Sequence, residues 1–125
     1  MRTVAVLGIK TSETGAPAYF VPEYAQRAGL TIYPIPVYYP YLTQLLGERV
    51  YRSVGAIDDR VDLVDVFRRP QDLAAHLDDL LAARPRAVWF QTGIRNDEVA
   101  QKLAESGIDV VQDRCLMVEL KARGR

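Results

Sequence analysis

The chain has 125 residues, 49% of them hydrophobic, which predicts one domain, residues 1–125, with its own core. The formal net charge is zero, so no overall field favours nucleic acid or an anionic membrane, and we expect neither as a partner. The lone Cys115 excludes an internal disulfide and a cysteine metal cluster, and the lone His76 excludes a multi-histidine metal site. No apolar run approaches the roughly 20 residues of a spanning helix. Because Met1-Arg2 leads directly into a predicted strand without a signal-peptide pattern, we expect a cytoplasmic protein.

The first predicted strand is Thr3–Leu7, a short apolar, β-branched run that ends at Gly8. A polar loop runs from Lys10 to Gly15, and Pro17 opens a predicted helix. Strand, Gly-containing turn and helix start together are typical of a nucleotide site, because a helix N-terminus offers unpaired N–H groups to phosphate. An ordinary connecting turn of a doubly wound domain has the same pattern. The glycines match neither the G-x-G-x-x-G spacing nor a Walker loop.

Strands and helices alternate along the rest of the chain. The other predicted strands are Thr31–Val37, Asp62–Phe67, Arg86–Gln91 and Ile108–Gln112. The predicted helices are Ala18–Ala28, Pro70–Ala83 and Asn96–Ser106, with a short terminal helix or turn at Cys115–Ala122. Tyr38–Tyr41 is predicted as an aromatic loop and Leu45–Ile57 as a connecting segment with short structure at most. This alternation predicts an α/β fold: a five-stranded parallel sheet in the order 3-2-1-4-5 with helices on both faces, a three-layer αβα sandwich.

Prolines and capping residues refine these elements. Pro22 must lie in the first turn of its helix or distort it, and Pro34 and Pro36 argue against a fully paired second strand. Asn96 is the predicted N-cap of its helix. The apolar spacing of the first helix is carried by Tyr19, Phe20, Tyr24 and Ala28.

Cationic residues follow several of the predicted strands. Lys10 follows the first strand, Arg68 and Arg69 the third, Arg95 the fourth and Arg114 the fifth. Ligands of such sheets bind outside the carboxyl ends of the strands, so this edge suits a ligand with several phosphates. The alternative is that some of these arginines pair with nearby carboxylates such as Asp97 or Asp113.

The end of the second strand argues against a dinucleotide enzyme of the usual kind. An NAD site places Asp or Glu there to bind the ribose, whereas this chain has Pro36-Val37-Tyr38-Tyr39. Phe67 and Ile94 could form an apolar slot for an adenine ring. No catalytic residue is predicted, since a Ser-His-Asp set requires His76 in the site and Cys115 reads as a small buried residue.

Three further segments carry a resemblance to a known family. They are VDLVDVFRRPQDL at Val61–Leu73, VWFQTGIRNDEVAQKLAESGIDVV at Val88–Val111 and DRCLMVE at Asp113–Glu119, with LLGERVYRSV at Leu45–Val54 matching as well. Together they closely resemble the small, single-domain CoA-binding proteins, which are similar to the N-terminal CoA-binding domain of the succinyl-CoA synthetase α-subunit.

The resemblance implies a Rossmann-like domain that binds coenzyme A, or acyl-CoA, through its adenosine diphosphate part. It implies phosphate contacts from the first loop and nucleotide contacts beyond the second, third and fourth strands. The residues carried over are Gly8, Ile9, Lys10, Thr11, Ser12, Pro36, Val37, Tyr38, Phe67, Arg68, Gln91 and Ile94. The synthetase's phosphohistidine and nucleotide-activating domains have no counterpart in 125 residues, so we expect a carrier, sensor or subunit without its own catalysis.

Two positions depart from the family pattern, and two alternatives stay open. Lys10 stands where the family usually has Ser, and Pro36-Val37 stands where it has Asn-Pro. We hypothesise that the Lys10 charge replaces the hydroxyl contact. One alternative is an NAD-type dinucleotide-binding enzyme or redox sensor. The other is a degenerate domain retained as a protein-interaction module.

Overall fold

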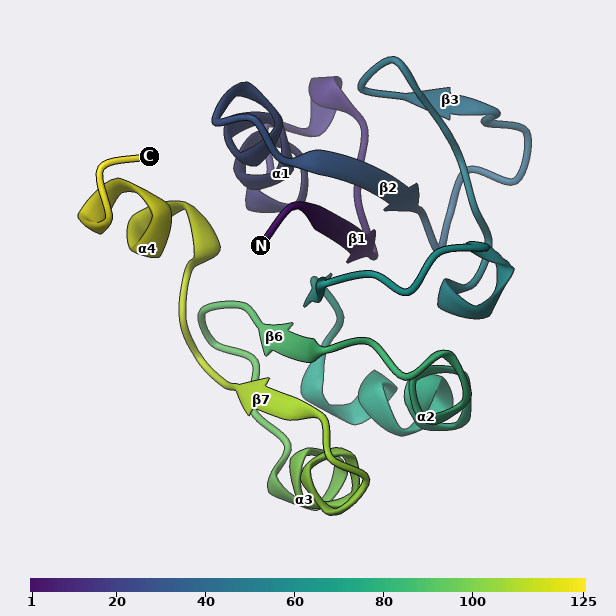
Figure 1. Cartoon of the computed structure of the whole chain (residues 1–125). Helices are drawn as coiled ribbons and strands as arrows, with labels where there is room; N and C mark the ends of the chain where they lie inside the picture. The colour runs from purple at the N-terminus through teal and green to yellow at the C-terminus, as the bar shows by residue number, and fades with distance from the viewer.

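Five parallel strands form the central sheet of the molecule (Figure 1). The computed structural model describes residues 1–125. The strands of the sheet, in spatial order, are β2 (Thr31–Ile35), β1 (Thr3–Leu7), β5 (Leu63–Val66), β6 (Ala87–Phe90) and β7 (Asp109–Val111). A separate antiparallel hairpin pairs β3 (Gln44–Leu45) with β4 (Glu48–Arg49). The predicted five-stranded parallel α/β fold is confirmed.

The predicted lateral order of the strands is wrong. Counted along the chain, the order is 2-1-3-4-5, because the third predicted strand, β5, pairs directly with β1. The reason lies in Pro34 of β2. The Pro34 carbonyl faces away from β1 and accepts a hydrogen bond from the Tyr51 N–H at 2.8 Å. A further strand on that side would also have to accept a hydrogen bond from the N–H of residue 34, and proline has no N–H. This strand therefore lies at the edge, and the order reverses between β1 and β5.

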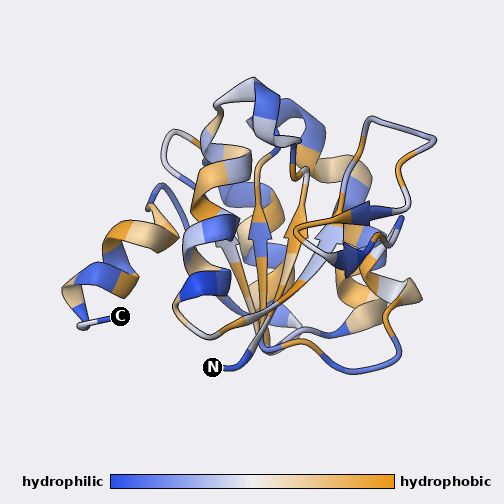
Figure 2. Cartoon of the chain, turned by 90° about the horizontal axis from the view of Figure 1, so that it is seen from above, coloured by the Kyte–Doolittle hydropathy of each residue, from blue (hydrophilic) through white to orange (hydrophobic).

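Helices cover both faces of the sheet, as predicted. Side chains of β1 alternate between them: Val4 and Val6 pack toward α1 (Pro17–Arg27) and α4 (Leu116–Ala122), while Ala5 and Leu7 belong to the opposite core cluster. That second cluster includes residues of α2 (Leu77–Ala83) and α3 (Asp97–Glu105). Figure 2 shows the hydrophobic residues concentrated on the strands between the two helical layers.

Helix α1 buries a different stripe from the predicted one. Its buried residues are Ala18, Val21, Pro22 and Ala25. The aromatic side chains instead lie at the margin of the core: the Tyr19 hydroxyl donates to Glu23 at 3.2 Å, and the Tyr24 hydroxyl donates to the Arg125 carbonyl. Phe20 is 40% exposed. The tyrosine hydroxyl groups need hydrogen-bond partners and therefore lie at the surface, whereas the small aliphatic residues of the buried stripe need none.

Pro22 lies beyond the first turn of α1 and leaves one helical carbonyl without its usual partner. Proline has no N–H to donate to the carbonyl four residues earlier, which is that of Ala18. The Lys10 N–H donates to this carbonyl instead, at 3.1 Å. The Ala18 carbonyl that Pro22 leaves free thus links α1 to the loop after β1.

The helices on the other face begin and end largely as predicted. Asn96 caps α3 through a side-chain bond from the Val99 N–H at 3.1 Å, which confirms the predicted N-cap. The predicted helix over Pro70–Ala83 is a 3-10 segment, Pro70–His76, followed by α2. Short 3-10 segments lie at Ser12–Thr14 and Val54–Ala56. None of the helices has the length and apolar character needed to cross a membrane.

Candidate functional site

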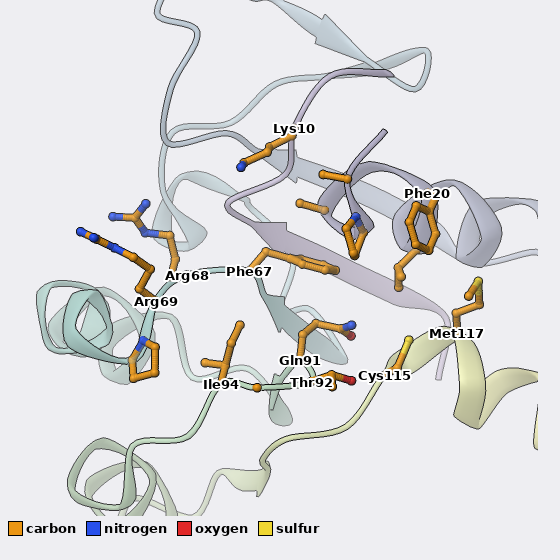
Figure 3. A pocket seen from close by; sticks show the side chains of 16 residues that line it. Lys10, Phe20, Phe67, Arg68, Arg69, Gln91, Thr92, Ile94, Cys115 and Met117 are labelled. Carbon is orange, nitrogen blue, oxygen red and sulfur yellow. The ribbon is translucent and has the colours of Figure 1, made fainter. Parts of the chain in front are cut away.

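A cavity of about 570 Å³ opens at the carboxyl edge of the sheet, beside the point where the strand order reverses. Its walls come from the loop after β1, the start of α1, the ends of β5 and β6, and the start of α4 (Figure 3). This size is in the range of small-molecule sites. The lining residues are Lys10, Ala16, Pro17, Ala18, Phe20, Val21, Phe67, Arg68, Arg69, Pro70, Gln91, Thr92, Gly93, Ile94, Cys115 and Met117.

The structure brings only part of the predicted set together. The predicted residues that line the cavity are Lys10, Phe67, Arg68, Gln91 and Ile94. The remaining predicted residues, Gly8, Ile9, Thr11, Ser12, Pro36, Val37 and Tyr38, lie outside its lining. Among these, the Ile9 and Pro36 side chains are buried, so only their backbone is available to a ligand. Tyr38 is 61% exposed, and its ring lies 5.9 Å from the guanidinium carbon of Arg68, next to the cavity.

Gly8 serves the sheet rather than the cavity. Its φ is +90°, and a Cβ at this position would lie 2.3 Å from the Phe67 carbonyl oxygen. The Gly8 N–H donates to the Ile35 carbonyl at 2.8 Å. Only a residue without a side chain lets the chain leave β1 this close to the end of β5.

One end of the cavity is cationic. Arg69 donates to Asp72 at 2.7 Å, and Arg68 lies 3.7 Å from the same carboxylate. The hydrogen bond from Arg69 lowers the pKa of Asp72. One carboxylate therefore faces two guanidinium groups, and Lys10 adds a third cation without an acidic partner within 4.0 Å. This end keeps a net positive charge.

The neutral imidazole of His76 holds Arg68 in place by accepting a hydrogen bond from it. The Arg68 Nε–H lies 3.3 Å from His76 Nε2, which accepts the bond. Burial first, and the Arg68 guanidinium second, lower the pKa of His76, so the imidazole is neutral at pH 7 and free to accept. The Arg68 side chain is only 16% exposed, which fixes its direction at the cavity edge.

Arg52 holds the aromatic loop after β2 in place. Its guanidinium donates to four carbonyl groups within this loop, at distances of 2.8 to 3.3 Å: those of Pro36, Tyr38, Tyr39 and Leu42. Tyr39 has a φ of +62°, a conformation that L residues adopt only where surrounding bonds impose it. The loop beside Arg68 is therefore a fixed surface.

Gln91 lies between the two ends of the cavity with one half of its amide occupied. The residue is 4% exposed, and its Oε1 accepts from the Leu116 N–H, the first of α4, at 3.0 Å. This bond orients the amide, and its Nε2 donates to no protein atom. Figure 3 shows the amide turned toward the space between Phe67 and Cys115. Gln91 thus presents an unused hydrogen-bond donor to the cavity.

The other end of the cavity is apolar, and none of its residues was predicted as a site residue. Phe20 of α1 faces Cys115 and Met117 at the start of α4 (Figure 3), and Val21 also lines the cavity. The signal available in the sequence was Phe20, a large apolar residue that lies off the small-residue stripe of its helix. The approach of the two helix starts is a tertiary contact that no local pattern encodes.

The remaining cations of the carboxyl edge do not line the cavity. Arg95 pairs with Asp97 at 3.0 Å, and Arg114 pairs with Glu119 at 3.3 Å. Asp113 instead accepts from the Gly93 N–H at 2.7 Å. The alternative that arginines pair with nearby carboxylates therefore holds for Arg95 and Arg114.

One buried carboxyl lies in the sheet itself. Asp65 of β5 is 0% exposed, neither of its carboxyl oxygens has a hydrogen-bond partner, and its neighbours in register are Val6 and Trp89. Burial raises the pKa of Asp65 well above its ordinary value. It does not line the cavity.

Comparison with known families and proteins assigns the chain to a family. A family model described as a CoA binding domain matches residues 2–121. The chain belongs to this CoA-binding domain family. It is 31% identical over 117 residues to YneT of Bacillus subtilis (strain 168), covering 94% of this chain and 84% of that protein.

Solved structures share the fold. The structure of cell-free ID.343 from Thermus thermophilus has a TM-score of 0.88 and 42% identity, covering 97% of this chain and 89% of that one. The dinucleotide-forming acetyl-coenzyme A synthetase 1 of Ca. Korarchaeum cryptofilum, in complex with phosphate and ADP, has a TM-score of 0.71. At 19% identity, over 87% of this chain and 25% of the synthetase, it shows likeness of fold alone.

Proposed function

We propose that residues 1–125 form one CoA-binding domain that holds coenzyme A or acyl-CoA in the cavity at the carboxyl edge, as a carrier, sensor or subunit without its own catalysis. The observation that carries the proposal is the division of the cavity into a cationic end and an apolar end. Coenzyme A has the same division: its nucleotide carries the phosphates, and the pantetheine arm, whose sulfur carries any acyl group, is uncharged. Family membership supports the same ligand.

The phosphates would lie against Lys10, Arg68 and Arg69. The start of α1 faces the same space and has no acidic residue in its first turn, so its N-terminal charge is available to an anion. Helix α3 carries Asp97 and Glu98 in its first turn and suits an anion poorly. The loop Gly8–Ser12 offers a phosphate fewer free backbone N–H groups than its length suggests, because the N–H groups of Gly8 and Lys10 already donate hydrogen bonds within the fold.

The nucleotide would extend from the phosphates toward the loop after β2. Pro36, Val37 and Tyr38 form the surface beside Arg68 that Arg52 holds fixed. Phe67 and Ile94 line the cavity on the side of β5 and β6 and flank the ligand. The Pro36–Tyr39 stretch lacks the carboxylate that an NAD ribose requires, which disfavours the dinucleotide alternative.

Calorimetric titration of CoA into cation variants tests the site. Arg68→Met and Lys10→Ala should each weaken CoA at least about tenfold, since each removes a charged contact to phosphate. Arg95→Met is the matched control, because Arg95 is an exposed cation of the same edge outside the cavity. Equal losses in Arg68→Met and Arg95→Met would place the ligand elsewhere.

The absence of catalysis has its own test. Acetyl-CoA incubated with stoichiometric protein should release free thiol no faster than in buffer, as followed with a thiol reagent. Steady thiol release above the buffer rate that depends on folded protein would overturn the non-catalytic role and leave binding intact.

A further inference from the structure

The two ends of the cavity differ in what they can bind. Lys10, Arg68 and Arg69 lie at one end, and no cation lines the other, where Phe20, Cys115 and Met117 converge (Figure 3). Arg114 precedes Cys115 in the chain, but its guanidinium is paired with Glu119 outside the cavity lining. A carboxylate or phosphate at the apolar end would therefore lose its hydration without gaining a charged partner.

The amide of Gln91 supplies a directed hydrogen bond next to this apolar end. The bond from Leu116 fixes which side of the amide is the acceptor, and Nε2 remains as a donor without a protein partner. A carbonyl oxygen on a ligand in the cavity could accept this hydrogen bond. The site thus presents one donor for a carbonyl, followed by an apolar wall.

Phe20 is the most exposed apolar part of that wall. It is 40% exposed although Val21 beside it in the chain is fully buried, so the ring covers cavity space rather than core. Met117 is half-buried across the cavity, and its flexible thioether can adapt to ligands of different shape. Aliphatic groups between these side chains would lose contact with water.

We infer that the apolar end is an acyl subsite, in which Gln91 Nε2 donates to the thioester carbonyl and Phe20 and Met117 pack on a short, uncharged aliphatic acyl chain. The inference rests on the proposed function and narrows it: the preferred ligand is an uncharged acyl-CoA, and free CoA and dicarboxylic acyl-CoA bind more weakly. Free CoA has no carbonyl on its sulfur, and without an acyl chain it leaves part of the wall uncovered.

Four ligands, titrated by calorimetry under one buffer, test each part of the inference. Butyryl-CoA should bind about tenfold tighter than CoA, because its acyl carbons become buried. The S-butyl thioether of CoA, which keeps the chain but lacks the carbonyl, should bind at least about threefold weaker than butyryl-CoA, since it leaves Gln91 unpaired. Succinyl-CoA should bind at least about tenfold weaker than butyryl-CoA, because its carboxylate meets no cation.

The outcomes separate this inference from the proposed function. Binding of CoA and butyryl-CoA with equal affinity would overturn the acyl subsite and leave CoA binding standing. Equal affinity of the thioether and the thioester would remove the role of Gln91, and tight binding of succinyl-CoA would remove the preference for uncharged chains. Failure of all four ligands to bind would overturn the proposed function and the subsite together.

A pair of variants locates the subsite. In Phe20→Ala the ratio of butyryl-CoA to CoA affinity should fall toward one, since the most exposed part of the apolar wall is gone. In Val118→Ala the ratio should stay at about ten, because Val118 is 57% exposed on α4 and does not line the cavity. An unchanged ratio in Phe20→Ala would place the acyl chain elsewhere and overturn the inference.

Discussion

Replacing Gly8 by alanine tests the geometry of the crevice on which the site is built. The substitution has two costs. A Cβ at a φ of +90° carries conformational strain of about 1–2 kcal/mol. The same atom would lie 2.3 Å from the Phe67 carbonyl oxygen, which belongs to backbone that the Phe67 N–H ties to Leu7 at 2.9 Å. Forcing that backbone to move adds about 1–3 kcal/mol.

Gly29 provides a control that has the strain without the clash. Its φ is +97°, and a Cβ there would meet no atom within 4 Å. Gly29→Ala should therefore lower the free energy of unfolding by about 1–2 kcal/mol, and Gly8→Ala by about 2–5 kcal/mol. Urea denaturation followed by circular dichroism measures both values. Equal losses within about 0.5 kcal/mol would refute the close approach of the loop after β1 to the end of β5.

Three further substitutions have defined outcomes. Asp65→Asn should stabilise the protein increasingly as pH rises above about 4, because Asp65 ionises there in the unfolded chain but stays protonated when buried in the folded protein. Below that pH the substitution should give no such gain. A difference in urea midpoints that does not depend on pH would contradict the raised pKa of Asp65. Arg52→Met removes four bonds to loop carbonyls, so amide exchange across Pro36–Leu42 should accelerate at least about tenfold, and unchanged protection would show that the loop is held otherwise. Pro22→Ala adds an N–H that competes with Lys10 for the same carbonyl, so the Lys10 amide should exchange faster while the amides of β1 do not; equal protection of Lys10 in both proteins would rule out the competition.

Much of the fold follows from local sequence patterns. Short apolar, β-branched runs such as Thr3–Leu7 form strands because they suit a sheet buried on both faces, and Asn96 begins its helix because its side chain caps the Val99 N–H. The lateral order of strands does not follow from periodicity, since both common doubly wound orders bury the same residues. Pro34 carried the missing information: a strand without that N–H belongs at the edge.

The residues of the candidate site also fall into those that the sequence could predict and those that it could not. Lys10 and Arg68 could be predicted because they directly follow parallel strands, whose carboxyl ends share one edge. Phe20 and Met117 could not, because their helix starts meet only after α1 and α4 pack side by side on one face of the sheet. Arg95 and Arg114 have the same sequence signal as Arg68, and only the structure shows that Arg68 lines the cavity and that the other two do not.

Binding of coenzyme A in the cavity can be measured by calorimetry with CoA, ADP and NAD at one salt concentration. We expect CoA to bind with a stoichiometry of about one. ADP should bind more weakly because it lacks the pantetheine arm, and NAD should bind more weakly than CoA because no carboxylate follows β2. Binding of NAD as tight as that of CoA, or no binding of CoA at all, would contradict these expectations.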